Sequence, residues 1–307
     1  MPRGDGWFRL HGMTNVARVG STTLPFDLVD VFGQAPLSGN PLAVVHHADH
    51  LDTLAMLALT RWLNLSETTF LLRPTHPEAD YRVRIFTPQH ELPFAGHPTL
   101  GSCHAWLQAG GQPLQNGLIR QECAAGRIPV RPTGDGLAFA APPLVRHGGV
   151  APEEQQRVAD VLGLAPGSWV DMAWTDNGPG WLSVLLPSAQ AVRGLSPRLP
   201  VPAPDAPPAQ LAIGVIGPQD ADCGTRFEVR AFITDQHGRL IEDPVTGSLN
   251  AALAQWLIGT DRAQAPYAVA QGGCLQRDGR ISVTQDGAGQ VWIGGRTLTV
   301  SQGQVSA

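Results

Sequence analysis

Glu91-Leu92-Pro93-Phe94-Ala95-Gly96-His97-Pro98-Thr99-Leu100-Gly101 is a stretch that predicts a tight turn leading directly into a helix. Proline is well tolerated at the start of a helix, so Pro98 is expected as the first helical residue, with His97 at the N-cap or just before it. The residues that follow are apolar on nearly every side of the helix: Leu100, Cys103, His104, Ala105, Trp106 and Leu107. This pattern predicts a buried helix. Its first turn has unpaired N–H groups, which offer a binding site for a carboxylate or another anion.

A second copy of this unit lies later in the chain. The strand-like segment Tyr81–Phe86 is matched 146 positions later by Phe227–Phe232. The turn Pro93–Gly96 is matched 151 positions later by Pro244–Gly247, and each turn opens an apolar helix. Two similar strand-turn-helix units indicate a duplicated domain. We therefore expect two helix N-termini to face one cleft between two halves of the molecule.

The composition is that of a globular protein with about two domains. The chain has 307 residues, 43% of them hydrophobic, which is enough for a core in each domain. A net charge of −5 and the lack of a Lys/Arg run argue against nucleic acid or an anionic membrane as a partner. We see neither a run of about twenty apolar residues nor an apolar leader, so we expect no membrane span and a cytoplasmic location. The four cysteines have no CxxC spacing and are expected as reduced, buried thiols.

Short strands and a few helices account for the rest of the first half. We expect strands over 26–32 and 42–45 and a helix over 52–63. That helix should cover the sheet with an apolar stripe formed by Leu54, Leu57, Ala58 and Trp62.

The second half has a similar pattern. A helix is expected over 152–162, and Gly294-Gly295 is expected as a turn between two tail strands. The proline-rich segment 187–210 cannot be regular throughout and is expected as a surface excursion. Many strands and one buried helix in each half predict an α+β fold, in which a barrel-like, mostly antiparallel sheet surrounds a central helix.

Three segments are expected from the breaks in pattern. Residues 1–24 form a flexible arm without chemistry that we can name. Residues 25–145 form the first half-barrel domain, which the C-terminal strand near 297–307 can complete. Residues 146–296 form the second, because the prolines and glycines at 142–149 mark a boundary.

Five motifs resemble the phenazine-biosynthesis isomerase-like (PhzF-like) proteins, and they follow that family's order from about Phe26 to Val300. They are Gly39–Val45, Asn64–Phe70, Arg84–Pro88, Glu91–Gly101 and Glu242–Ser248. The resemblance implies a diaminopimelate epimerase-like fold with two pseudo-symmetric halves and an active site in the cleft between them. It also implies a homodimer that acts on a small molecule.

The resemblance further implies site residues. The family's acid/base glutamate matches Glu67. Its other active-site residues match Gly96, His97, Asp243 and Ser248, and Thr246 and Gly247 lie in the same motif and are expected to help bind the substrate. The chain departs from the family in its N-terminal arm, its proline-rich run and residues 272–280, which leaves substrate size and dimer contacts open.

These residues favour a cofactor-independent isomerase. Glu67 would move a proton on a small carboxylate-bearing metabolite, because burial between two halves raises a carboxyl's affinity for a proton. His97 and Asp243 would orient the substrate or pass on a proton. The two helix N-termini would hold the substrate's carboxylate. No metal, flavin or nicotinamide is required, and a dinucleotide fingerprint is missing.

Other interpretations stay open. The same site could perform epimerisation or a lyase or hydrolase step, and a non-catalytic small-molecule binding protein could keep the site without turnover. Glu67 could be a solvated carboxylate, and His97, Asp243 and Ser248 could be helix-capping residues. No cysteine precedes a central helix, which argues against a thiol pair as acid and base. The cluster His46-His47-Ala48-Asp49-His50 is expected to be solvated rather than a metal site.

Overall fold

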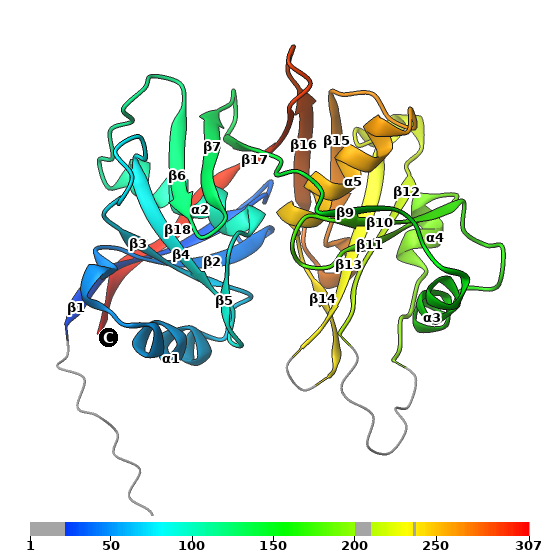
Figure 1. Cartoon of the computed structure of the whole chain (residues 1–307), viewed down its shortest axis with the longest axis horizontal. Coiled ribbons are helices and arrows are strands. Elements are labelled where there is room, and N and C mark those ends of the chain that lie inside the picture. The colour runs from blue at the N-terminus through cyan, green and yellow to red at the C-terminus, as the bar shows by residue number, and fades with distance from the viewer. Residues whose placement is uncertain (1–21, 200–209, 236–237, 307) are drawn as a thin grey trace, which may run out of the picture.

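The computed structural model describes residues 22–199, 210–235 and 238–306. Figure 1 shows two lobes side by side, with helix α2 (Gly96–Gln108) in one and helix α5 (Gly247–Gly259) in the other. The expected N-terminal arm lies almost entirely outside the described residues. No helix within the described ranges is long and apolar enough to cross a membrane.

The first lobe combines strands from the start of the chain with the last strand. They are β1 (Thr23–Val31), β2 (Asn40–Val45), β3 (Thr68–Leu72), β4 (Tyr81–Phe86), β5 (Glu91–Leu92), β6 (Ile119–Cys123), β7 (Gly126–Pro132), β8 (Leu137–Ala140) and β18 (Thr297–Ser306). Besides α2, the lobe holds the short helix η1 (Ala48–His50) and helix α1 (Thr53–Leu63). Strand β18 pairs antiparallel with the whole length of β1, from Thr23 opposite Ser306 to Val31 opposite Thr297.

The second lobe contains the strands between these. They are β9 (Arg146–Gly149), β10 (Asp171–Asp176), β11 (Leu182–Leu185), β12 (Ala212–Pro218), β13 (Phe227–Thr234), β14 (Leu240–Asp243), β15 (Tyr267–Gln271), β16 (Gly279–Gln285) and β17 (Val291–Gly295). Its other helices are α3 (Pro152–Leu162), α4 (Ala189–Arg193), η2 (Ala221–Cys223) and η3 (Gly273–Leu275). Strand β17 pairs with β8, so the sheet continues from one lobe into the other. We propose the two lobes as the two domains.

The two lobes repeat one strand pattern. In the first, the parallel pairs are β2–β3 and β4–β6, and in the second they are β11–β12 and β13–β15, while the other pairs are antiparallel. The strand register makes Glu67 equivalent to Ala212. Thr68 pairs with Phe86, and Ile213 pairs with Phe232, which is the repeat equivalent of Phe86. The residues just before Thr68 and Ile213 are Glu67 and Ala212.

The repeat extends to an ion pair in each lobe, partly buried in the first lobe and more deeply buried in the second. Arg84 donates two hydrogen bonds to Glu91, from Nε at 2.7 Å and from Nη2 at 2.6 Å, one to each carboxylate oxygen. Arg230 holds Glu242 in the same two-point manner, at 2.9 and 2.7 Å. The pairs join β4 to β5 in the first lobe and β13 to β14 in the second, just before the turn that leads to each central helix. Such planar, two-bond pairs fix geometry as well as charge.

The two central helices touch at their N-termini. A Cβ added to Gly96 would lie 2.7 Å from the Cα and carbonyl carbon of Gly247, and one added to Gly247 would lie 2.9 Å from the same atoms of Gly96. Only glycine on both sides allows the backbones to come this close. The contact joins one lobe to the other at the place where the sequence repeat predicted two helix N-termini.

The start of α2 differs from the sequence prediction. The helix begins at Gly96 with Ala95 as its N-cap, so His97 and Pro98 are its second and third residues. A residue before proline normally avoids helical geometry. Here the close contact between Gly96 and Gly247 sets the first turn and overrides that local preference.

The predicted packing face of α1 was also wrong. Leu54 and Trp62 are 76% and 80% exposed, whereas Met56 and Thr60 are buried. Met56 packs with Phe70 and other residues of β3 and β4, and the Thr60 hydroxyl is satisfied because it donates to the Met56 carbonyl. The buried face of α1 therefore carries Met56 and the polar Thr60, and it lies to one side of the predicted apolar stripe.

Two smaller predictions need correction, and a third falls partly outside the described residues. Gly294 and Gly295 are the end of β17 rather than a turn, since a Cβ on Gly295 would lie 2.4 Å from the Phe32 ring. The four free cysteines are not all buried: Cys103 is buried and Cys123 half-buried, but Cys223 and Cys274 are exposed. The short helix α4 lies in the proline-rich segment, of which residues 200–209 are outside the described ranges.

Replacing Gly96 by Ala should destabilise the protein by about 3 kcal/mol, because the new Cβ would meet backbone that cannot move aside as a side chain can. Gly259→Ala, at the exposed end of α5 where an added Cβ meets no atom within 4 Å, is the control and should be neutral or slightly stabilising. Urea unfolding followed by circular dichroism measures both. Equal stability of the two variants would contradict the contact.

Candidate active site

The first turns of α2 and α5 form the centre of the site. Neither N-cap, Ala95 or Thr246, caps its helix with a side-chain hydrogen bond. The helices meet at Gly96 and Gly247, so the positive ends of two helix dipoles lie together. No acidic residue stands in either first turn to offset them. This arrangement suits a bound anion.

Glu67 lies at this junction. It directly precedes β3 and follows the left-handed residue Asn64, which ends α1. Its Oε2 is 3.5 Å from Nε2 of His97, and the two side chains are only 16% and 4% exposed. Both of these atoms are buried and neither has a hydrogen-bond partner of normal geometry among the described residues. Two buried polar atoms without partners point to a missing ligand or proton donor.

His97 is neutral. Burial lowers its pKa to about 3, although a hydrogen bond to the Pro41 carbonyl opposes that shift. Nδ1 lies 3.4 Å from Nδ2 of Asn40, but the two protons of that amide go to the Val245 carbonyl and to Asp243. Nδ1 therefore carries the proton given to Pro41, and Nε2 presents a lone pair toward Glu67.

Asp243 reaches the site from the second lobe. Its Oδ1 accepts from Asn40 Nδ2 at 3.1 Å and from Ser66 Oγ at 3.5 Å, and its Oδ2 accepts from the Thr246 hydroxyl. Burial raises its pKa to about 6 although these hydrogen bonds lower it. Burial, and then the charge of Asp243, raise the pKa of Glu67 well above its ordinary value. The charge of Asp243 therefore favours the protonated form of Glu67.

The Thr246 hydroxyl is fully used in holding the Asp243 carboxylate in place. Its hydroxyl donates to that carboxylate and accepts from Nε2 of Gln271 at 2.9 Å. Gln271 in turn accepts from the Thr246 N–H and from Asn250, so the amide is used at both ends. Ser248 is held differently, by Asn177 and Trp181 of the β10–β11 turn.

Sequence analysis gave no role to Asn40, Gln271 or Asn250. Asn40 is fully buried and links the lobes, because it lies at the start of β2 and donates to Asp243 and Val245. The Gly-Asn-Pro motif that contains Asn40 was noticed, but spacing alone could not show a partner more than 200 residues away. Gln271 had no local signal at all.

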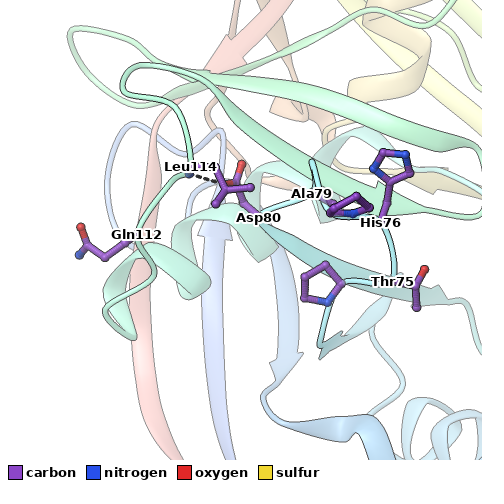
Figure 2. A pocket seen from close by; sticks show the side chains of 8 residues that line it. Thr75, His76, Ala79, Asp80, Gln112 and Leu114 are labelled. Carbon is purple, nitrogen blue, oxygen red and sulfur yellow. Dashed lines mark hydrogen bonds between the residues drawn. The ribbon is translucent and has the colours of Figure 1, made fainter.

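Other polar features lie apart from this centre. The hollow in Figure 2, about 390 Å³, is lined by loop residues such as Thr75, His76 and Leu114, whose N–H donates to Asp80. His46 of the histidine cluster is buried and paired with Asp27 at 2.8 Å, so it is not solvated as predicted. Within the described ranges no group of three or more His, Cys, Asp or Glu residues is placed to hold a metal ion.

Known proteins resemble this chain over most of its length. A family model described as phenazine biosynthesis-like protein matches residues 29–303. Antisense-enhancing sequence 1 of Schizosaccharomyces pombe is 32% identical over 293 residues, which cover 91% of this chain and 97% of that protein. Trans-2,3-dihydro-3-hydroxyanthranilate isomerase of Pseudomonas aeruginosa is 33% identical over 274 residues, which cover 86% and 91%.

Solved structures show the same fold. A PhzF-family phenazine biosynthesis protein of Bacillus anthracis has a TM-score of 0.74 at 22% identity, with 92% of this chain and 99% of that chain covered. A hydroxyproline epimerase of Agrobacterium vitis has a TM-score of 0.56 at 15% identity, with 92% of each chain covered. The predicted α+β, epimerase-like fold class and the predicted isomerase class are confirmed. The homodimer and the cytoplasmic location stay predictions.

The raised carboxyl pKa values make stability depend on pH. A carboxyl whose pKa is higher in the folded than in the unfolded protein holds its proton more tightly when folded. Its contribution to the free energy of unfolding is therefore full below the ordinary carboxyl pKa and is lost as pH rises through the folded value. For Asp243 that window runs from 3.8 to about 6, and for Glu67 it begins at 4.5 and extends upward.

Glu67→Gln should remove the Glu67 part of this dependence. Relative to the variant, the wild type should lose stability as pH rises above 4.5, because the unfolded wild-type chain then ionises Glu67 while the folded protein keeps it protonated, and Asp243 is present in both proteins. Urea unfolding at a series of pH values measures the difference. Glu153→Gln, at an exposed carboxyl in α3, should follow the wild type. A stability difference between Glu67→Gln and wild type that does not change with pH would refute the buried, raised carboxyl.

Proposed function

On the premise that the chain belongs to the phenazine biosynthesis-like family and is an isomerase, we propose that Glu67 moves a proton between carbon atoms of a small carboxylate-bearing metabolite. The observation that carries this proposal is the buried, unpartnered Oε2 of Glu67, facing the neutral His97 ring at the meeting point of two helix N-termini.

A carboxyl in this setting suits proton transfer to and from carbon. When ionised it is a stronger base than an exposed carboxylate, because burial and the charge of Asp243 raise its pKa. When protonated it can donate to carbon or to the Nε2 lone pair of His97. His97 stays neutral, so it orients the carboxyl without competing for the charge.

The substrate's carboxylate would bind at the first turns of α2 and α5. There the unpaired backbone N–H groups can donate to the carboxylate, and the positive ends of both helix dipoles attract it. The Ser248 hydroxyl adds a further donor. The same donors stabilise negative charge that moves onto the carboxylate while a neighbouring carbon is deprotonated. Gly96 and Gly247 serve this site because they allow the two turns to meet.

The proposed step balances without another reactant. Ionised Glu67 takes a proton from a carbon next to a double bond, the C–H electrons shift the double bond toward the carboxylate-bearing carbon, and the protonated Glu67 returns the proton to a different carbon. Asp243, held by Asn40 and Thr246, keeps its charge and position throughout. The step has no net oxidation, so it needs no redox cofactor.

Epimerisation is a second candidate, favoured by one observation. Asp243 is a second carboxyl with a raised pKa, about 6, and it comes from the opposite lobe. A pair of acid/base groups on two lobes could remove a proton from one face of a carbon and return one to the other face. The product structure separates the two reactions, because epimerisation returns a proton to the carbon that lost one, whereas isomerisation places the proton on a different carbon and moves the double bond.

We expect Glu67→Gln to slow proton transfer by about 10³-fold, since glutamine has no exchangeable acid/base proton at that position. The first substrate to test is trans-2,3-dihydro-3-hydroxyanthranilate, on which the Pseudomonas aeruginosa relative is named to act. The measurement is product formation and deuterium incorporation in D₂O, followed by NMR. Simple carboxylate-bearing cyclohexadienes extend the panel.

Glu153→Gln is the control and should keep wild-type rates, because this carboxyl is exposed on α3. Exchange by Glu67→Gln within about tenfold of wild type would rule out Glu67 as the acid/base. Binding of the carboxylates by wild type and variant alike, with neither product formed nor deuterium incorporated by either, would instead indicate a binding protein.

A further inference from the structure

The turn between β10 and β11, residues 176–181, has a fixed shape of its own. Asp176 Oδ1 accepts hydrogen bonds from the N–H groups of Gly178 and Gly180, both at 2.7 Å. Gly178 and Gly180 have φ values of 135° and 89°, which side-chain-bearing residues rarely adopt. The turn is therefore preorganised rather than shaped by what it contacts.

Two side chains of this turn donate to Ser248 in the first turn of α5. Asn177 Nδ2 lies 2.8 Å from the Ser248 carbonyl oxygen, and Trp181 Nε1 lies 3.2 Å from the Ser248 hydroxyl oxygen. Asn177 and Trp181 are 8% and 2% exposed. An indole N–H can only donate, so Trp181 occupies a lone pair of the hydroxyl and leaves the hydroxyl proton to be donated elsewhere.

Asn177 has a second polar atom that nothing satisfies. Its Oδ1 is buried and has no hydrogen-bond partner among the described residues. It belongs to the same planar amide that contacts Ser248, so it lies beside the first turn of α5. Buried amide oxygens are nearly always paired in folded proteins, and an unpaired one at a binding site indicates a donor that arrives with the ligand.

We infer that the 176–181 turn is a specificity element of the active site. Trp181 is a positioning residue that aims the Ser248 hydroxyl proton at the substrate's carboxylate. Asn177 is a specificity residue whose Oδ1 accepts a hydrogen bond from an N–H or O–H group next to that carboxylate. The inference rests on the proposed function, because that function places the carboxylate at the two helix N-termini.

Isothermal titration calorimetry of the full chain with two probes tests the inference. Benzoate offers a carboxylate alone, and 2-aminobenzoate adds an N–H donor beside it. The wild type should bind 2-aminobenzoate about tenfold more tightly than benzoate, as expected for one well-placed buried hydrogen bond. Asn177→Leu should abolish this preference by weakening the binding of 2-aminobenzoate while the affinity for benzoate changes little.

Trp181→Phe should weaken both probes by a similar factor and leave their ratio unchanged, because Ser248 then loses its orientation but Asn177 remains. Trp174→Phe, a half-buried tryptophan on β10 that stacks with Arg146, is the matched control and should bind like the wild type. Circular dichroism checks that each variant folds. If Asn177→Leu does not fold, Asn177→Ala is judged by the same ratio.

Equal loss of both probes in the Asn177 variant would show a purely structural role and overturn the inference. A wild type that does not distinguish the probes, or that binds neither, would also overturn it. The ratio involves no proton transfer, so the outcome is separate from that of Glu67→Gln: undiminished exchange in that variant refutes the proposed function, whereas an absent binding preference refutes the specificity element.

Discussion

The backbone contact between Gly96 and Gly247 is the constraint on which the rest of the structure depends. Two buried helices from different lobes can bring their first turns together only if neither carries a Cβ at the point of contact. The unpaired N–H groups and positive dipole ends of both helices then lie in one place. This placement explains why an acidic side chain such as Glu67 is tolerated there with so little exposure, and why an anion is the ligand that the site suits best.

A hydrogen-bonded network fixes the groups around that contact. Asn40 links the start of β2 to Asp243 and Val245, and Gln271 links the end of β15 to Thr246 and Asn250. Asn40 uses both of its amide N–H bonds and Gln271 uses both ends of its amide, so the two residues can hold Asp243 in place and keep its charge next to Glu67. Glu67 Oε2 and His97 Nε2, which face each other at the meeting point of the two helices, are among the buried atoms that keep no hydrogen-bond partner within the described residues. Hydrogen bonds thus fix Asp243 in place, while Glu67 and His97 keep polar atoms that a bound substrate could pair with.

Much of this could be predicted from the sequence, and the failures have physical reasons. The repeat of strand, turn and apolar helix is local, so it predicted both central helices and their meeting. The start of α2 and the packing face of α1 were wrong because tertiary contacts, the Gly96–Gly247 approach and the burial of Thr60, override local preferences. The roles of Asn40 and Gln271 depend on partners that folding brings from distant parts of the chain. The unpaired Asn177 oxygen likewise has no signature in residue spacing.

The register of the two lobes places Ala212 where the first lobe has Glu67. The scaffold is duplicated, but the carboxyl that we propose as the acid/base is not. One consequence concerns the second copy, which has the small side chain of Ala212 at the position where the first copy has a carboxyl. Ala212 is therefore a natural position for introducing a second reactive side chain. Such a variant could change the stereochemical outcome of a reaction in this scaffold.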